Sequence, residues 1–225
     1  MPRPALSVRA GFTLLELLVV VGIIGVMTGL VIPAFSSIGQ SGALNSAGNE
    51  MADLMGLARQ NSLSKNGMSA IVLVTNTSTR EQVVSVMQLL PRQDDQPLQS
   101  SDWTAITGWI PLPAGVFADV SPSDPGTCTT FQNASNGAPV SSGPPLPYVS
   151  IGGMQPATYK YALFCSGGSL LSASNAMLFL SNGHVDPPTG NAVFTPPILS
   201  GSSYPGNYYR LTVVAATGRV EIDRP

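Results

Sequence analysis

The stretch Phe12–Phe35, FTLLELLVVVGIIGVMTGLVIPAF, decides how this chain is built. It holds 24 residues and a single charged side chain, Glu16. A helix of this length would be about 36 Å long, which exceeds the roughly 30 Å of a bilayer's hydrocarbon core. The sequence therefore predicts a transmembrane helix over residues 12–35.

The residues before this stretch set its expected orientation. Arg3 and Arg9 precede it with no acidic residue nearby. Because flanking positive charge favours the cytoplasmic side, we expect a single pass through the inner membrane, with the N-terminus cytoplasmic and the remaining chain periplasmic or extracellular. A secretory signal peptide explains the stretch poorly, since the apolar region is too long and no A-x-A site follows it.

Glu16 is the feature that an ordinary membrane anchor leaves unexplained. A charged side chain in the membrane costs about 2.5–3.5 kcal/mol on insertion scales, and such residues are usually functional. The sequence around it, Gly11-Phe12-Thr13-Leu14-Leu15-Glu16 followed by the apolar run, resembles the cleavage and methylation signature of type IV prepilins and pseudopilins.

This resemblance implies a processing event and several site residues. A prepilin peptidase would cut after Gly11, removing residues 1–11 as a leader, and would methylate the new N-terminal residue, Phe12. Glu16 would be the carboxylate used in filament assembly, and Pro33 falls where the family commonly has a helix-bending proline.

The implied partners are other pilin or pseudopilin subunits. In an apolar filament core, the Glu16 carboxylate and the free amine of Phe12 on a neighbouring subunit could neutralise each other, whereas either group left unpaired would be costly.

Beyond the apolar stretch, residues 36–66 predict a continuation of the helix. Gly39, Gly42 and Gly48 each cost about 1 kcal/mol relative to Ala, which predicts a kink or partial unwinding there. An apolar face then recurs at three- and four-residue steps, made by Leu44, Ala47, Met51, Leu54 and Ala58. Asn66-Gly67 is a stop signal, so we expect the helix to pack on a sheet and to end at this pair.

Residues 67–225 predict a β-rich domain, so the fold class is α+β: a long N-terminal helix packed on an antiparallel sheet, as in pilins. Residues rich in β-branched types predict strands at 69–75, 81–90, about 104–110, 159–164 and 176–181. Hairpin turns are expected at Asn182-Gly183 and Thr217-Gly218. The segment 111–147 is dense in Pro, Gly and Ser and predicts a long loop.

Three later features narrow the resemblance: the helix end Ala58-Arg59-Gln60, a Phe-x-x-Asn-Gly turn at 179–183, and the closing Gly218-Arg219-Val220. Together they are similar to the H-type minor pseudopilins, a group that includes the minor pilins called FimT, and to Verru_Chthon D cassette proteins. The resemblance implies a structural minor subunit of a type II secretion pseudopilus, not an enzyme. The alternatives are a minor type IV pilin for adhesion or DNA uptake, and a membrane-anchored surface enzyme or binding module.

No catalytic or cofactor motif appears in the sequence, and we expect no cofactor and no metal site. His184 is expected to be a solvated residue after a turn. The acidic residues Asp94, Asp95 and Asp102 could hold calcium, but the EF-hand spacing is missing, which favours a solvated loop. Trp103 and Trp109 are expected to anchor the core or a loop.

Cys128 and Cys165 form no close-spaced pair of the kind found in zinc or redox motifs. In an extracytoplasmic domain they could form a disulfide, worth roughly 3–4 kcal/mol in the chain-entropy model. The alternative is two separate buried thiols.

Nucleic acid is not an expected partner. The formal net charge is −2, and the C-terminal arginines Arg210, Arg219 and Arg224 are interleaved with Glu221 and Asp223, which weakens attraction to phosphates.

Overall fold

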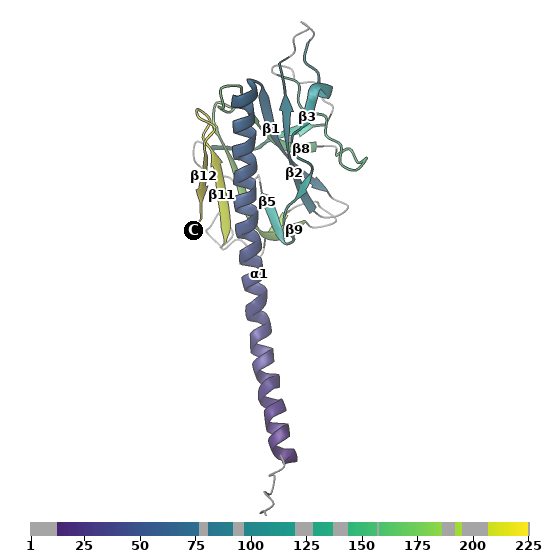
Figure 1. Cartoon of the computed structure of the whole chain (residues 1–225), viewed down its shortest axis with the longest axis vertical. Coiled ribbons are helices and arrows are strands. Elements are labelled where there is room, and N and C mark those ends of the chain that lie inside the picture. The colour runs from purple at the N-terminus through teal and green to yellow at the C-terminus, as the bar shows by residue number, and fades with distance from the viewer. Residues whose placement is uncertain are drawn as a thin grey trace, which may run out of the picture. The chain divides into compact units, whose positions relative to one another are not determined.

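The computed structural model describes residues 13–76, 81–91, 97–119, 128–136, 144–156, 158–185, 192–194 and 207–224. The chain forms two compact units, Met1–Ser41 and Gly42–Pro225. Figure 1 shows the elements that build them: one long helix, α1, and a set of strands that come later in the chain.

Helix α1 runs from Leu14 to Lys65, and the single long helix predicted from the sequence is confirmed. It stays helical through Gly39, Gly42 and Gly48, so the predicted partial unwinding does not occur. The helix also continues through Pro33, where a bend stays a prediction. At the C-terminal end Asn66 takes a positive φ of 50°, which confirms the stop at Asn66-Gly67.

Over the described residues, no helix qualifies by length and apolarity as a membrane span. The predicted transmembrane segment, residues 12–35, includes residues whose side chains lie outside the described set. It stays a prediction.

The first sheet has the order β3-β2-β1-β8-β7, with β4 pairing with β2, and its pairs are all antiparallel. Its strands are β1 (Met68–Asn76), β2 (Glu81–Leu89), β3 (Trp103–Ala105), β4 (Ile110–Pro111), β7 (Gln132–Ser135) and β8 (Thr158–Phe164). The predicted strands at 69–75, 81–90 and 159–164 are confirmed, and the one at 104–110 is divided into β3 and β4.

The second sheet has the order β10-β9-β11-β12, with β5 and β6 also pairing with β9. Its strands are β5 (Val116–Asp119), β6 (Cys128–Thr130), β9 (Asn175–Val185), β10 (Ala192–Phe194), β11 (Tyr208–Val213) and β12 (Val220–Asp223). The pairs are antiparallel apart from β6 with β9, which is parallel.

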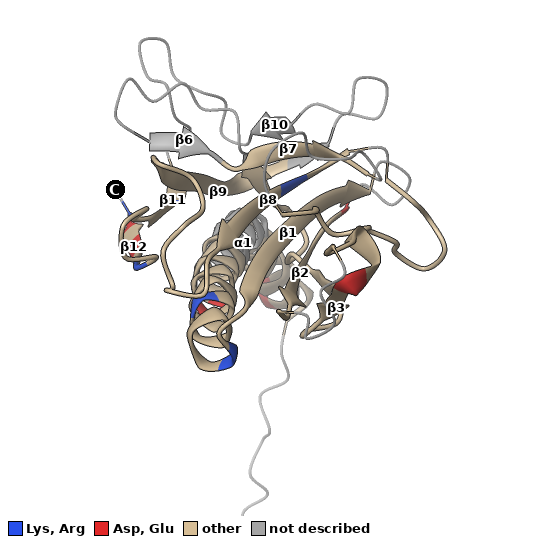
Figure 2. Cartoon of the chain, turned by 90° about the horizontal axis from the view of Figure 1, so that it is seen from above, with Lys and Arg blue, Asp and Glu red and all other residues tan. Residues whose placement is uncertain are grey.

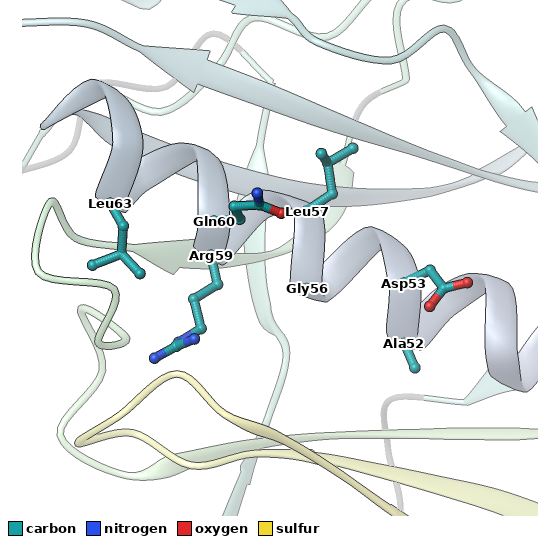
Figure 3. A pocket seen from close by; sticks show the side chains of 7 residues that line it. All are labelled: Ala52, Asp53, Gly56, Leu57, Arg59, Gln60 and Leu63. Carbon is teal, nitrogen blue, oxygen red and sulfur yellow. The ribbon is translucent and has the colours of Figure 1, made fainter.

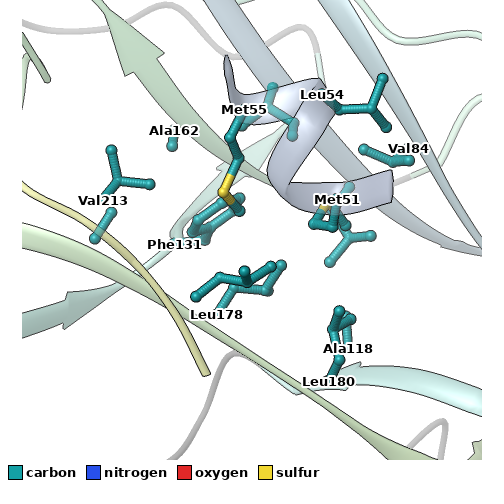
Figure 4. Packing of buried hydrophobic residues seen from close by; sticks show 14 of the residues in the cluster. Met51, Leu54, Met55, Val84, Ala118, Phe131, Ala162, Leu178, Leu180 and Val213 are labelled. Atoms are coloured by element: carbon teal, nitrogen blue, oxygen red, sulfur yellow. The ribbon is translucent and has the colours of Figure 1, made fainter. Parts of the chain in front are cut away.

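The second half of α1 lies against both sheets, as the view from above shows (Figure 2). The predicted apolar face of α1 is buried in the core, and Met55 joins it. Figure 4 shows Met51 and Met55 among side chains from both sheets, including Val84, Leu178 and Val213. The α+β prediction, with a helix packed on antiparallel sheet, is therefore confirmed.

The opposite face of the first sheet carries a second apolar cluster that includes Val72, Trp103 and Val149. The indole N–H groups of Trp103 and Trp109 donate to the carbonyl oxygens of Pro145 (2.7 Å) and Ser150 (3.1 Å). Both tryptophans therefore hold the 144–156 segment onto the sheet, which confirms them as anchors.

The prediction of one long loop over 111–147 is wrong, because the segment contributes β5, β6 and β7. These strands are three or four residues long and pair with the long strands β8 and β9. The Gln82 amide links β5 to the other sheet: its Nε2 donates to the Ala118 carbonyl (3.0 Å) and its Oε1 accepts from the Ala118 N–H (2.6 Å).

The predicted hairpin turn at Asn182-Gly183 is also wrong. Both residues lie inside β9, where Asn182 pairs with Val116 and Gly183 pairs with Phe194. The Gly183 N–H donates to the Gly115 carbonyl at 2.9 Å. Pairing on both sides therefore keeps the strand extended where the local sequence favours a turn. The other hairpin is confirmed: Gly218, at φ 64°, turns the chain between β11 and β12.

Candidate functional site

The N-terminus of α1 holds the acidic residue that the sequence singles out. Thr13 immediately precedes the helix, and Glu16 is the third helical residue. The Glu16 Oε2 atom accepts hydrogen bonds from the Thr13 N–H and the Thr13 hydroxyl, both at 2.9 Å. The Glu16 N–H in turn donates to the Thr13 hydroxyl oxygen at 3.3 Å. These reciprocal bonds form a capping box.

The capping box gives Glu16 a role inside its own chain. Its carboxylate satisfies a backbone N–H that would otherwise lack a partner at the helix start, and its negative charge lies at the positive end of the helix dipole. The part played by Thr13 was not predicted from the sequence. The signal was present, since Thr-x-x-Glu before an apolar run is the usual capping-box pattern.

The surroundings of Glu16 are apolar and outward-facing. Large hydrophobic side chains from Leu14 to Met27 are between 48% and 83% exposed. Exposed apolar surface of this extent marks a membrane or protein contact in a folded protein. The carboxylate is thus fixed at one end of a helix surface that is suited to lipid or to other helices.

Most of the remaining predicted site residues lie outside the described residues, and one lies in a strand. Gly11 and Phe12, the expected cleavage and methylation residues, lie outside the described residues, as do Asp94 and Asp95 and the side chain of Pro33. His184 belongs to strand β9, opposite Val193, and does not follow a turn as expected.

Asp102 caps the short 3₁₀ helix Ser100–Asp102, where its Oδ2 accepts from the Gln99 N–H at 2.8 Å. In the part of the chain that the structure describes, no three His, Cys, Asp or Glu side chains gather as a metal site would need.

Cys165 is a free, half-buried cysteine, which favours the alternative of two separate thiols, and the side chain of Cys128 lies outside the described residues. It follows β8 in the first sheet and begins a tight turn, in which its N–H and C=O both bond to the backbone of residues 168–169. Cys128 begins β6 in the second sheet, opposite Asn175. The two cysteines therefore belong to different sheets, each held by its own backbone partners.

We accordingly expect Cys165 to react with iodoacetamide in the oxidised, unreduced protein. The reaction should be slow, because the thiol is half-buried, and should accelerate on unfolding. Peptide mass spectrometry after alkylation without reductant provides the measurement. Recovery of a disulfide-linked peptide pair containing Cys128 and Cys165 would contradict the prediction.

Two of the C-terminal arginines are engaged within the chain. Arg210 forms an ion pair with Asp223, and the guanidinium of Arg224 lies 5.2 Å from the centre of the Tyr209 ring. Arg219 is exposed. Two of the three arginines that cluster in the sequence therefore stabilise the β11–β12 hairpin.

Comparison with known proteins agrees with the N-terminal prediction. Residues 6–32 match the prokaryotic N-terminal methylation motif, so the predicted prepilin-type N-terminus is confirmed. No curated protein is significantly similar in sequence to the chain. Among solved structures, the chain is similar to the minor pseudopilin EpsH from the type 2 secretion system of Vibrio cholerae. The two share 13% identity over 81% of this chain and 97% of that one, with a TM-score of 0.39.

Proposed function

We propose that this chain is a structural minor subunit of a type II secretion pseudopilus, cut after Gly11 by a prepilin peptidase and methylated at Phe12. The observation that carries the proposal is the methylation motif over residues 6–32, in register with the capped carboxylate of Glu16. Its role is assembly rather than catalysis, and its partners are the peptidase, the inner membrane and other pilin-like subunits.

The mechanism follows from the geometry around Glu16. In the single subunit, the capping bonds from Thr13 both go to Oε2. Oε1 takes no hydrogen bond from the described residues and can accept one from the amine of a neighbouring Phe12. Such a bond is strong where water is excluded, because both partners are charged. The apolar side chains from Leu14 to Met27 would then pass from lipid into contact with other helices.

The second candidate is a minor type IV pilin, which shares this N-terminal chemistry. Its DNA-uptake form is disfavoured, because Arg210 and Arg224 are engaged in the last hairpin. Adhesion would use the same helix and a different domain surface. A membrane-anchored enzyme or binding module is the third candidate, and it would not need Glu16.

Processing provides the direct test. The mature protein purified from its native host is expected to begin at Phe12 with a methylated α-amine, which intact and N-terminal mass spectrometry would detect. Gly11→Val should leave the leader attached, because a larger side chain at the cut position obstructs the peptidase. A mature N-terminus at Met1, or one well beyond Phe12, would refute the processing and the filament role with it.

A further inference from the structure

The hairpin formed by β11 and β12 contacts α1 at two separate places in the unit Gly42–Pro225. The first is buried. The Tyr209 ring lies so close to Gly48 that a Cβ there would be 2.5–2.8 Å from three ring carbons. The Tyr209 hydroxyl donates to Asn45 Oδ1 at 3.0 Å, and Arg224 lies near the same ring. This contact belongs to the main core.

The second contact combines an exposed hydrogen bond with a buried contact between two turns. The Arg59 side chain points to the turn between β11 and β12 (Figure 3), where its Nε donates to the Thr217 carbonyl at 2.7 Å. Gly218 lies against the Gly168 carbonyl, and Gly168 in turn lies against Leu63. The turns that contain Gly168 and Gly218 therefore interlock at the side of α1.

The two contacts differ in what holds them. Tyr209 is 7% exposed and packs with Leu211 and Val213, which are fully buried. The Arg59 bond is solvent-exposed, and β12 is exposed along most of its length. Exposed hydrogen bonds with few apolar neighbours open more readily than core contacts. The two attachments of the hairpin to α1 therefore differ in burial.

We propose that the β11–β12 hairpin is a clasp on α1 with two closures. The buried closure, Tyr209 on Gly48, holds the helix in the core. The exposed closure, the hydrogen bond of Arg59 to Thr217, opens without unfolding the domain. This proposal is independent of the proposed function.

Opening of the exposed closure would change the solvent-facing side of α1. Arg59 and Leu63 also line a groove of about 590 Å³ on that side, together with Asp53 and Gln60. With the closure intact, the guanidinium is directed out of this groove toward the hairpin (Figure 3). Once the bond to Thr217 breaks, the Arg59 guanidinium is free to move along the groove. The shape of the groove therefore depends on whether this bond is formed.

Hydrogen exchange of the full chain in detergent micelles tests the clasp. Arg59→Met removes the donor and keeps most of the side-chain stem. Gln60→Met is the matched control, because Gln60 is the exposed neighbour that lines the same groove. We expect the amide of Leu170, whose N–H donates to the Ala215 carbonyl of the hairpin, to exchange about three- to tenfold faster in Arg59→Met, with β1 unchanged and Gln60→Met like the wild type.

A second variant separates the two closures. Gly48→Ala forces the Tyr209 ring to move, so exchange should rise in the core segments of α1 and β11 as well as in the turns. If Arg59→Met leaves the Leu170 amide unchanged, or accelerates exchange equally in β1, the exposed closure is not a separate opening unit and the proposal fails. The same follows if Gly48→Ala affects the turns alone.

Discussion

Gly218→Ala is expected to lower the free energy of unfolding by about 3–5 kcal/mol. Gly218 is buried at φ 64°, and a Cβ there would be 1.8 Å from the Gly168 carbonyl oxygen. The obstacle is backbone, so no side-chain rotation can relieve it. Either the turn between β11 and β12 or the turn at Gly168 must move.

Gly152→Ala is the control for this substitution. Gly152 has a similar φ of 55°, and no atom lies within 4 Å of a Cβ built there. It should therefore lose only the cost of left-handed backbone, about 1–2 kcal/mol. Denaturant unfolding of both variants in the same detergent measures the difference. Equal losses would mean that the turns at Gly168 and Gly218 are not tightly interlocked.

Local patterns explain why much of the fold could be predicted. The apolar face from Leu44 to Ala58 repeats at helical spacing, and β1 and β2 are rich in β-branched residues. The secondary structure of each of these elements therefore follows from its own residues. The strands β5, β6 and β7 escaped prediction because each is only three or four residues long. They are stabilised by β8 and β9, which lie later in the chain.

Long-range contacts account for the errors. Asn182-Gly183 has the composition of a turn, but Val116 pairs with Asn182 from a distant part of the sequence and keeps it in a strand. Gly48 was interpreted as a weak point of the helix. The structure instead places Tyr209 against it, with a hydrogen bond to Asn45 that joins residues 164 positions apart. The residues around Gly48 carry no signal for so distant a partner.

The candidate site at the start of α1 depends on local signals alone. Glu16 could be identified from sequence because a lone carboxylate in an apolar run is costly and its spacing from Gly11 matches a known signature. The role of Thr13 is also encoded locally, by the Thr-x-x-Glu pattern. Predicting it requires treating Glu16 as a helix-capping residue as well as an assembly residue. Because both capping bonds go to Oε2, they leave Oε1 for the assembly bond that we propose.

Glu16→Ala should therefore reduce incorporation into filaments tenfold or more while leaving the subunit cleaved and abundant in the membrane. Removing the carboxylate lifts the insertion cost of about 2.5–3.5 kcal/mol, so the monomer should enter the membrane at least as readily. In the filament, the substitution leaves the amine of a neighbouring Phe12 without its counter-charge in an apolar setting. A buried charge that loses its partner costs about 3–5 kcal/mol.

Variants at Thr13 distinguish the two roles of the carboxylate. Thr13→Val keeps the acid and removes the hydroxyl that positions it, at a cost of about 1 kcal/mol in capping, whereas Thr13→Ser keeps both. Incorporation should thus fall in the order wild type and Thr13→Ser, then Thr13→Val, then Glu16→Ala. Crosslinking to other pilin-like subunits in cells measures it, with the amount of cleaved protein as the control. Because an anchored enzyme or binding module would not need the acid, equal crosslinking of Glu16→Ala and wild type would exclude Glu16 from assembly and favour that third function.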